Sequence, residues 1–177
     1  QDTAELFFEE VRVPASHLLG EEGQGFKYLM QKLAQERLLV SVGCQARAEA
    51  ALQWTVAYVQ ERKAFRQRLA DFQNTRFKLA ALATDLQAGR AYCDQLIAQH
   101  LAGELDAVGA AAGKLWHSEL LGRVTDECLQ LFGGYGYMAE YPIARAYADA
   151  RIERIYAGTS EIMKEIIARD LLDAPKS

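Results

Sequence analysis

Glu36 is the residue whose type and position point most clearly to chemistry. It interrupts an apolar stripe at helical spacing, whose other members are Leu29, Leu33, Val40 and Cys44. Burying an ionised carboxylate is costly, so Glu36 is expected to be paired with a cation or shifted toward its neutral form. Such a carboxylate can act as a general base toward a carbon-bound proton. A structural ion pair with Arg37 or with another helix explains the same pattern, and periodicity alone favours this second interpretation.

Three further segments could take part in a binding site, the first and the last of them by holding an anion. Residues 61–68 (ERKAFRQR) place a basic cluster at a predicted helix end, where cations are favoured. Residues 130–137 (QLFGGYGY) follow a helix rather than a strand, so the dinucleotide fingerprint does not apply, but glycines let another surface approach the backbone. Residues 156–161 (YAGTSE) put amides and hydroxyls at a helix start. A solvated linker, a turn and an ordinary cap are the alternative interpretations.

The cysteines and histidines do not suggest a metal centre. Cys44, Cys93 and Cys128 are far apart and odd in number, which is typical of buried, reduced thiols rather than of a disulfide framework. The histidines fit no spacing of zinc ligands either; they are His17, His100 and His117. No metal ligand is therefore predicted.

Long helices must position these residues, because no proline occurs between Pro14 and Pro142. Apolar periodicity predicts helices over about 26–62, 72–100 and 105–131, a short helix after Pro142 and a last helix after Gly158 capped by Thr159 or Ser160. Residues 3–13 alternate and end at Pro14, so they are predicted to form a strand. The fold class is thus all-α: an antiparallel four-helix bundle with a short extra helix, preceded by a β-strand arm.

Composition narrows the classes of function. The 177 residues are 50% hydrophobic and 25% charged, with a net charge of −4, which is typical of a soluble globular chain without a basic face for nucleic acid. Charged residues interrupt every apolar run of membrane-spanning length, so no membrane span is predicted. Small molecules and other proteins remain as partners.

Taken in order, the segments FFEEVRVP, QERLL, ERKAF, FQ, QLFGGYGY and YAGTSEIMKE resemble the C-terminal helical domain of the flavin-dependent acyl-CoA dehydrogenases, closest to the long-chain and isovaleryl branch. The resemblance covers nearly the whole chain. It implies that residues 1–24 are the last strand and linker of a truncated β-domain, and that residues 25–177 are the helical bundle domain.

The resemblance also implies an FAD site shared between subunits. Arg62, Phe65 and Gln73 match residues that hold the dinucleotide. Thr159 and Glu161 match a segment near the flavin. The loop that receives the adenosine-diphosphate part from a neighbouring subunit matches Gln130, Leu131, Phe132, Gly133 and Gly134.

Two places for the catalytic base occur in this family. One precedes the GTSE motif and is Ala157 here, which has no acid or base function. The other is the glutamate of the ERL motif, which is Glu36, and Arg37 would then lie beside the acyl-CoA. One departure from the pattern is Arg66, where the family usually has glycine after ERKAF.

The implied activity is α,β-dehydrogenation of an acyl-CoA thioester to the trans-2-enoyl-CoA, with Glu36 taking the α-proton and FAD accepting the hydride. Implied partners are an electron-transfer flavoprotein and further copies in a homodimer or homotetramer, and the implied location is the cytoplasm, or the mitochondrial matrix in a eukaryote. The isolated 177 residues are expected to be inactive. A non-catalytic helical interaction domain and an acyl-CoA oxidase-like flavoprotein are the alternatives.

Overall fold

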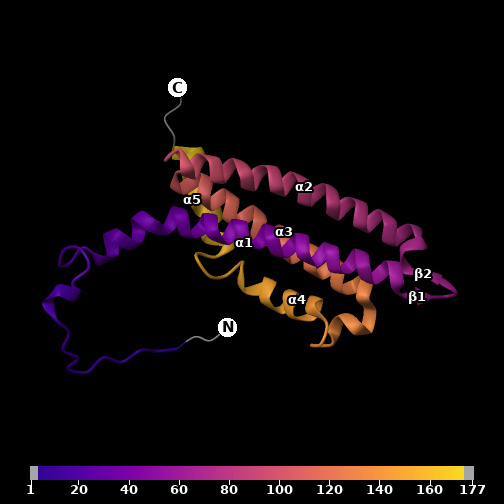
Figure 1. Ribbon diagram of the computed structural model, residues 1–177. Coiled ribbons are helices and arrows are strands. Elements are labelled where there is room, and N and C mark those ends of the chain that lie inside the picture. The colour runs from indigo at the N-terminus through magenta and orange to yellow at the C-terminus, as the bar shows by residue number, and fades with distance from the viewer. Residues whose placement is uncertain (1–3, 174–177) are drawn as a thin grey trace.

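Three long helices lie side by side along most of the molecule (Figure 1). They are α1 (Gly25–Glu61), α2 (Gln73–Leu101) and α3 (Ala107–Phe132) in the computed structural model, which describes residues 4–173. Their short connections make α2 antiparallel to both neighbours. The helices predicted over 26–62, 72–100 and 105–131 are thereby confirmed.

The predicted helix boundaries follow from capping residues. Asp106 caps α3, because its Oδ1 accepts a hydrogen bond from the amide of Gly109 at 2.7 Å. Gly133 ends α3 with a φ of 60°, which glycine adopts easily. Pro142 stands in the first turn of α4 (Pro142–Ile152), and Thr159 Oγ1 accepts from the amide of Ile162 at the start of α5 (Ser160–Asp173). Local sequence therefore sets where each helix begins and ends.

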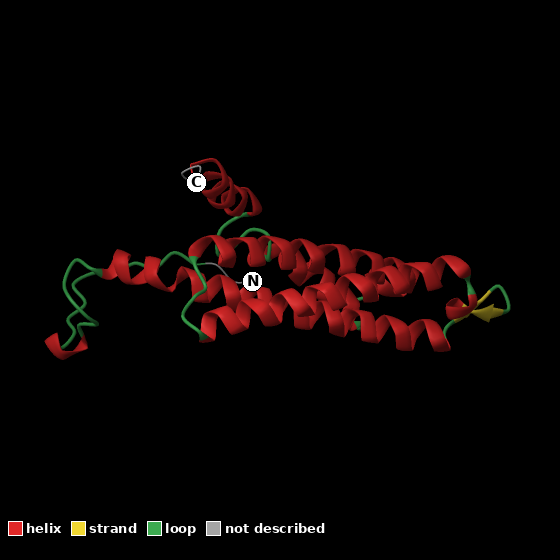
Figure 2. Cartoon of the chain, turned by 90° about the horizontal axis from the view of Figure 1, so that it is seen from above, coloured by secondary structure: helices red, strands yellow, loops and turns green. Residues whose placement is uncertain are grey.

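The core lies where α1, α2, α3 and α4 meet. Small side chains of α1 face larger ones of its neighbours there, and the fully or nearly fully buried set includes Cys44, Ala48, Ala51, Leu82, Leu86, Leu120, Leu121, Val124, Cys128, Ile143 and Ala150. The prediction of buried thiols is confirmed for all three cysteines. The shorter α5 packs on α3 and projects to one side of the bundle (Figure 2).

Two segments differ from their predicted structure. Residues 4–14 form an exposed extended arm rather than a strand, because no neighbouring strand pairs with their backbone in the described chain, and Thr3 lies outside the described residues. The arm leads through a short 3-10 turn, Ala15–His17, into α1. That residues 1–24 belong to a β-domain stays a prediction.

The second difference is a hairpin in the predicted linker. The strands β1 (Lys63–Ala64) and β2 (Gln67–Arg68) pair antiparallel and lead through a 3-10 turn, Leu69–Asp71, into α2. Its loop has only two residues, Phe65 and Arg66, and both have positive φ. This hairpin closes one end of the bundle.

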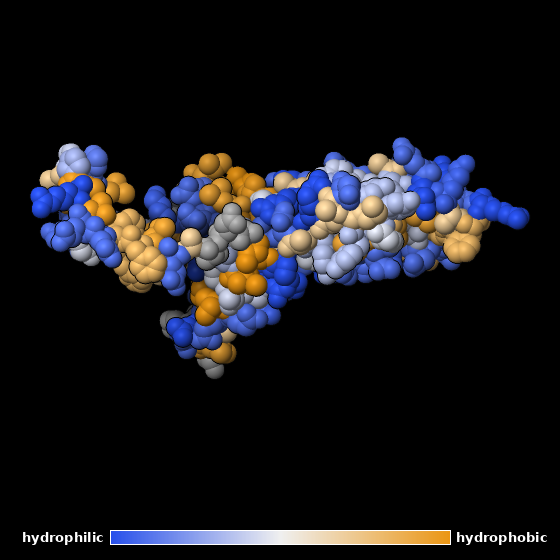
Figure 3. Space-filling view, turned by 90° about the horizontal axis from the view of Figure 1, so that it is seen from below, coloured by the Kyte–Doolittle hydropathy of each residue, from blue (hydrophilic) through white to orange (hydrophobic). Residues whose placement is uncertain are grey.

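Apolar side chains gather at the opposite end of the molecule, on the arm and the start of α1 (Figure 3). Exposed apolar residues there include Leu6, Phe7, Phe8, Phe26 and Leu29. Within residues 4–173, none of the helices combines the length and the hydropathy that crossing a membrane requires.

Candidate functional site

A pocket of about 440 Å³ opens at the hairpin end of the bundle. We call it the hairpin-end pocket. It is lined by Tyr58, Arg62, Leu69, Gln130, Leu131, Phe132, Gly133, Gly134, Tyr135 and Met138. The structure thus brings together six of the predicted cofactor residues, Arg62 and the loop 130–134, which come from opposite halves of the sequence.

The hairpin-end pocket combines a cation, aromatic rings and bare backbone. Arg62 ends α1, and its guanidinium lies 5.1 Å from the ring centroid of Tyr135. Tyr58 stacks on Phe132 at 4.0 Å between ring centroids and donates a hydrogen bond from its hydroxyl to the Phe132 carbonyl at 3.2 Å. Burial raises the pKa of Tyr58, so the hydroxyl keeps its proton. A planar group carrying phosphate suits these surroundings.

The loop 133–134 leaves its backbone accessible to a ligand. A side chain added at Gly133 or at Gly134 would meet no atom within 4 Å, so open space lies over both residues. The Gly133 amide already donates to the Gln130 carbonyl, so the two glycines offer a ligand close approach to the backbone rather than a set of free donors. This feature fits the expectation that residues 130–134 receive a phosphate-bearing group.

Four predicted cofactor residues lie outside the hairpin-end pocket, and two of them, Phe65 and Gln73, belong to the hairpin and to the start of α2. Phe65 is at the hairpin tip and is 91% exposed, with its ring 6.4 Å from that of Phe72. Gln73 is the exposed first residue of α2. Their predicted role is to contact the cofactor, and it stays a prediction.

Sequence reasoning missed the aromatic residues of this pocket, although a signal for them existed. Tyr58 precedes Arg62 by four residues and therefore shares its face of α1. Tyr135 belongs to the GGYG segment, where only the glycines led to a prediction. A search for aromatic residues one helical turn from a basic helix end would have found Tyr58.

The apolar stripe around Glu36 is not buried as a whole, contrary to expectation. Leu29 is 67% exposed and Glu36 is exposed, whereas Cys44 is completely buried. The reason is that the first turns of α1 extend beyond the adjoining ends of α2 and α3 (Figure 1), so neither of these helices covers them. Within residues 4–173 no salt bridge involves Glu36, so the ion pair proposed as its alternative role is absent there.

Arg37, the next residue, is buried instead. It is only 7% exposed, and its Nε has no hydrogen-bond partner within the described chain. Burial lowers the pKa of its guanidinium. A buried cation with a free donor is set up to receive an acceptor from a ligand or from another part of the protein.

The loop that leads into α5 holds the remaining predicted residues. Ala157 has a φ of 53° and Gly158 a φ of 100°, so two successive residues are left-handed. Thr159 caps α5, and Glu161 is exposed in its first turn. Hydrogen bonds from its own backbone amide and from Thr159 lower the pKa of Glu161. Thr159, Glu161 and the neighbouring Arg154 are among the residues that line a smaller pocket of about 180 Å³.

Lys114 of α3 belongs to this end and was missed by sequence reasoning. It is the largest fully buried side chain of the described residues, and its Nζ donates a hydrogen bond to the Gly158 carbonyl at 2.7 Å. Burial, and the nearby charge of Arg37, lower the pKa of its ammonium. A lysine within the apolar run AAAGKLW was the only signal.

The predicted residues thus form two groups at different places along the bundle. Arg37 and Arg62 are separated by twenty-five residues of α1, or about 37 Å at the helical rise. The hairpin-end pocket contains one group, and the region around Arg37 and the loop 156–161 contains the other.

A family model described as the C-terminal domain of acyl-CoA dehydrogenase matches residues 23–172. The chain belongs to the acyl-CoA dehydrogenase family. The long-chain specific acyl-CoA dehydrogenase of Sus scrofa, a mitochondrial protein, is 52% identical over 172 residues, which are 97% of this chain and 40% of that protein. The chain therefore spans less than half of the length of this acyl-CoA dehydrogenase.

Solved structures of the acyl-CoA dehydrogenase family share the fold. An acyl-CoA dehydrogenase from Geobacillus kaustophilus is 49% identical with a TM-score of 0.88, covering 94% of this chain and 44% of its own. A chain in the structure of the electron transferring flavoprotein of Acidaminococcus fermentans is 36% identical with a TM-score of 0.86, covering 93% and 43%. The predicted family and all-α fold class are confirmed.

Proposed function

We propose that the protein carrying this chain catalyses the FAD-dependent α,β-dehydrogenation of an acyl-CoA thioester to the trans-2-enoyl-CoA. Membership of the acyl-CoA dehydrogenase family is the observation that carries the proposal. The long-chain specificity of the pig relative makes a long acyl chain the first substrate to test.

FAD fits the residues present at the hairpin-end pocket. Arg62 offers a charged donor for phosphate, Tyr58 and Tyr135 offer aromatic surface, and the absence of side chains at Gly133 and Gly134 leaves open space for the ligand over the backbone. When bound, FAD supplies the acceptor for the hydride equivalent that leaves the β-carbon. The pocket residues bind and orient it, with Phe65 and Gln73 as further contacts.

The separation of the two groups supports a site shared between two copies of the chain. About 37 Å of helix lies between Arg37 and Arg62, too far for one dinucleotide to contact both groups of the same chain. In a two-fold dimer each site takes one group from each copy. The protein is therefore proposed to be a homodimer or a homotetramer, with each FAD bound between subunits.

Glu36 is the proposed base that takes the α-proton. Its carboxylate is exposed and outside the salt bridges of the described residues, so it is available to a substrate. Ala157 has no group that could take its place. Arg37, buried beside it with a free Nε, is proposed to hold the acyl-CoA side of the site. Thr159 and Glu161 are proposed to lie near the flavin at the same end.

An electron-transfer flavoprotein is the proposed electron acceptor. The support is the match to a chain in the structure of such a flavoprotein from Acidaminococcus fermentans. The mitochondrial location of the pig relative suggests the matrix for a eukaryotic source, and the cytoplasm is proposed for a bacterial one.

Glu36→Gln in the full-length protein tests the proposal. The wild type should be yellow and should bleach when long-chain acyl-CoA is added without oxygen. The variant should stay yellow and lose turnover by at least about a thousandfold, because an amide takes no proton. Glu22→Gln makes the same chemical change at an exposed position before α1 and should behave as wild type.

Other results of this experiment would favour a different base or a different function. Near-normal turnover of Glu36→Gln would exclude Glu36 as the base. A colourless wild-type protein would favour a non-catalytic helical domain, and rapid peroxide release in air would favour an oxidase.

A further inference from the structure

The loop between α4 and α5 is tied to α3 by one buried lysine. Lys114 has no exposed surface, and its only hydrogen bond in the described residues runs from Nζ to the Gly158 carbonyl at 2.7 Å. The two residues are 44 positions apart in the sequence. The contact therefore fixes the loop to the centre of the bundle rather than to its own helix.

The backbone of this loop needs such support. Ala157 has a φ of 53°, which is unfavourable for a residue with a Cβ, and Gly158 follows with a φ of 100°. Strained residues of this kind persist only where their surroundings hold them. Gly158 is also close to Met163, so the loop is packed against α5 as well.

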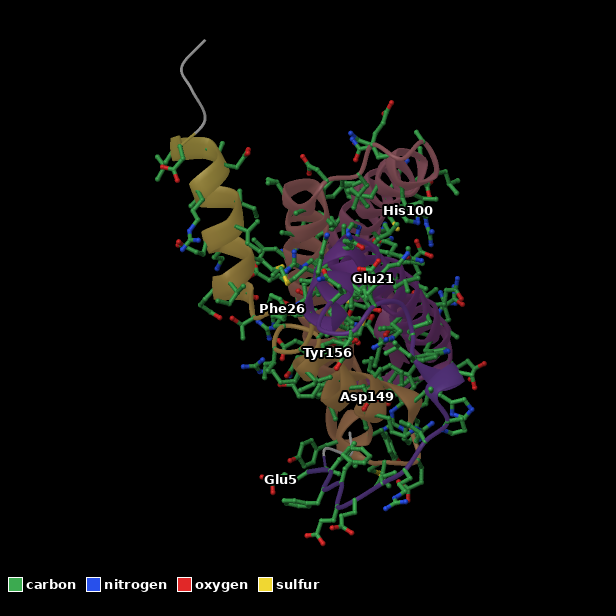
Figure 4. All side chains as sticks on the ribbon, turned by 90° about the vertical axis from the view of Figure 1, so that its left-hand side faces the viewer. Glu5, Glu21, Phe26, His100, Asp149 and Tyr156 are labelled. Carbon is green, nitrogen blue, oxygen red and sulfur yellow. The ribbon has the colours of Figure 1, made fainter. Side chains whose placement is uncertain are left out.

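A buried carboxylate ties the other side of the loop to α1. Glu153 is 1% exposed, accepts a hydrogen bond from the Tyr156 hydroxyl at 2.5 Å and forms an ion pair with Arg47. Cys44 of α1 approaches the same carboxylate at 3.6 Å. Figure 4 shows Tyr156 in this loop beside the ribbon of α1. The residues immediately before Ala157 are thus fixed as firmly as those after it.

Lys114 does not serve stability in an obvious way. An ammonium taken out of water keeps its charge only at a cost, and within residues 4–173 a single carbonyl contact leaves its other N–H groups without acceptors. Buried charges are therefore weak evidence for a stabilising role. Burying Lys114 costs free energy, and its one contact is with the loop that contains Thr159 and Glu161. This combination indicates that Lys114 positions the loop.

We propose that Lys114 is a positioning residue that holds the 156–161 loop in the geometry required by the active site. This inference rests on the proposed function, because the loop carries the residues proposed to lie near the flavin. Lys114 is proposed to act through the Gly158 carbonyl and not by contact with substrate or cofactor. Glu153 restrains the same loop from the side of α1.

Lys114→Met in the full-length holoenzyme tests the inference, because methionine keeps most of the volume and removes the donor. We expect kcat to fall about tenfold to a hundredfold, because small misplacements in an active site have effects of that size. The melting temperature should change little, because the lost hydrogen bond to Gly158 and the avoided burial of a charge act in opposite directions. Hydrogen exchange should quicken at the amides of Tyr156 and Ser160, which are bonded to Ile152 and Arg154, and stay slow in α3.

Two further variants complete the test. Lys27→Met removes an exposed lysine in the first turn of α1 that takes part in no salt bridge among residues 4–173, and it should change neither kcat nor exchange in the loop. Lys114→Gln keeps a shorter donor and should fall between wild type and Lys114→Met. It also serves as the measurement if the methionine variant does not fold.

The inference is overturned if kcat falls only in proportion to lost thermal stability, or if loop exchange and kcat both stay as in wild type. Wild-type protein that fails to bleach with acyl-CoA contradicts the proposed function instead. Loop exchange then still decides whether Lys114 holds the loop, because that measurement does not depend on turnover.

Discussion

Arg66 occupies a backbone position that suits glycine. It follows Phe65 in a two-residue hairpin loop, with φ values of 51° and 70° for the pair, as in a type I′ turn. The family resemblance implies glycine at position 66, and Arg66 departs from that pattern. The structure supplies the physical reason, because a side chain with a Cβ is strained at that φ.

Replacement of Arg66 by glycine should therefore stabilise the chain. We expect a gain of about 0.5–1 kcal/mol in the free energy of unfolding, which is the relieved strain less the extra entropy of glycine in the unfolded chain. Thermal or urea unfolding of the 177-residue chain measures it. Arg66→Ala removes the same charge but keeps the Cβ, so an equal gain in that variant would rule out backbone strain as the cause.

Single residues also mark the limit of what sequence can predict. The sequence pattern indicated that Glu36 would be buried, because periodicity reports which residues share a face but not how far the neighbouring helices extend. Lys114 shows the reverse error. A lysine in a helix is normally exposed, and only the position of the α4–α5 loop explains its complete burial.

At the scale of elements, the helices were predictable because their signals are local. Asp106, Gly133, Pro142 and Thr159 each act within one turn of the helix end that they define. The hairpin at 63–68 was not predictable in the same way. Its two-residue strands are too short for an alternating pattern, and its loop lacks the usual glycine.

The packing of α2 against α1 and α3 depends on Gly89. A Cβ added there would lie 2.4 Å from Oε1 of Gln45 and 2.8 Å from the ring of Trp116. The Gln45 side chain is also held in place, because it donates a 2.9 Å hydrogen bond to the Leu86 carbonyl. Gln45 is completely buried, so little room exists for it to move. The absence of a side chain at Gly89 thus allows the three helices to approach closely.

Gly89→Ala should therefore destabilise the chain by about 1–3 kcal/mol, as expected for overpacking. The matched control is Gly43→Ala within α1, where the added Cβ would meet only the flexible end of Arg47 at 3.4 Å. That change should stabilise by up to about 1 kcal/mol, because alanine favours helix more than glycine does. Urea unfolding of both variants measures the two signs, and a stabilised Gly89→Ala would contradict the packing argument.

At the scale of the whole molecule, the two groups of site residues lie apart along α1. The proposed dimer assigns the Glu36 group of one copy and the Arg62 group of the other to the same active site. This arrangement predicts that two inactive variants can restore activity by mixing.

Glu36→Gln and Arg62→Ala should each be nearly inactive as homodimers of the full-length protein, the second through weakened FAD binding. Refolding or coexpressing an equal mixture gives mixed dimers in half of the molecules, each with one intact site, so about a quarter of the wild-type activity should return. A mixture of wild type with the double variant gives mixed dimers without an intact site. No recovery in the first mixture would mean that each site is built within one chain.

Because α1 is one continuous helix, a small tilt at one end displaces residues at the other end. A tilt of one degree moves the far end of a rigid rod of about 37 Å by roughly 0.6 Å, and displacements near 1 Å are enough to slow a well-aligned reaction severely. Loosening the middle of α1, for instance by displacing Gln45 where it meets Gly89, therefore acts on both ends at once. In the proposed dimer these ends serve different active sites, so one such change would disturb the base of one site and the cofactor pocket of the other.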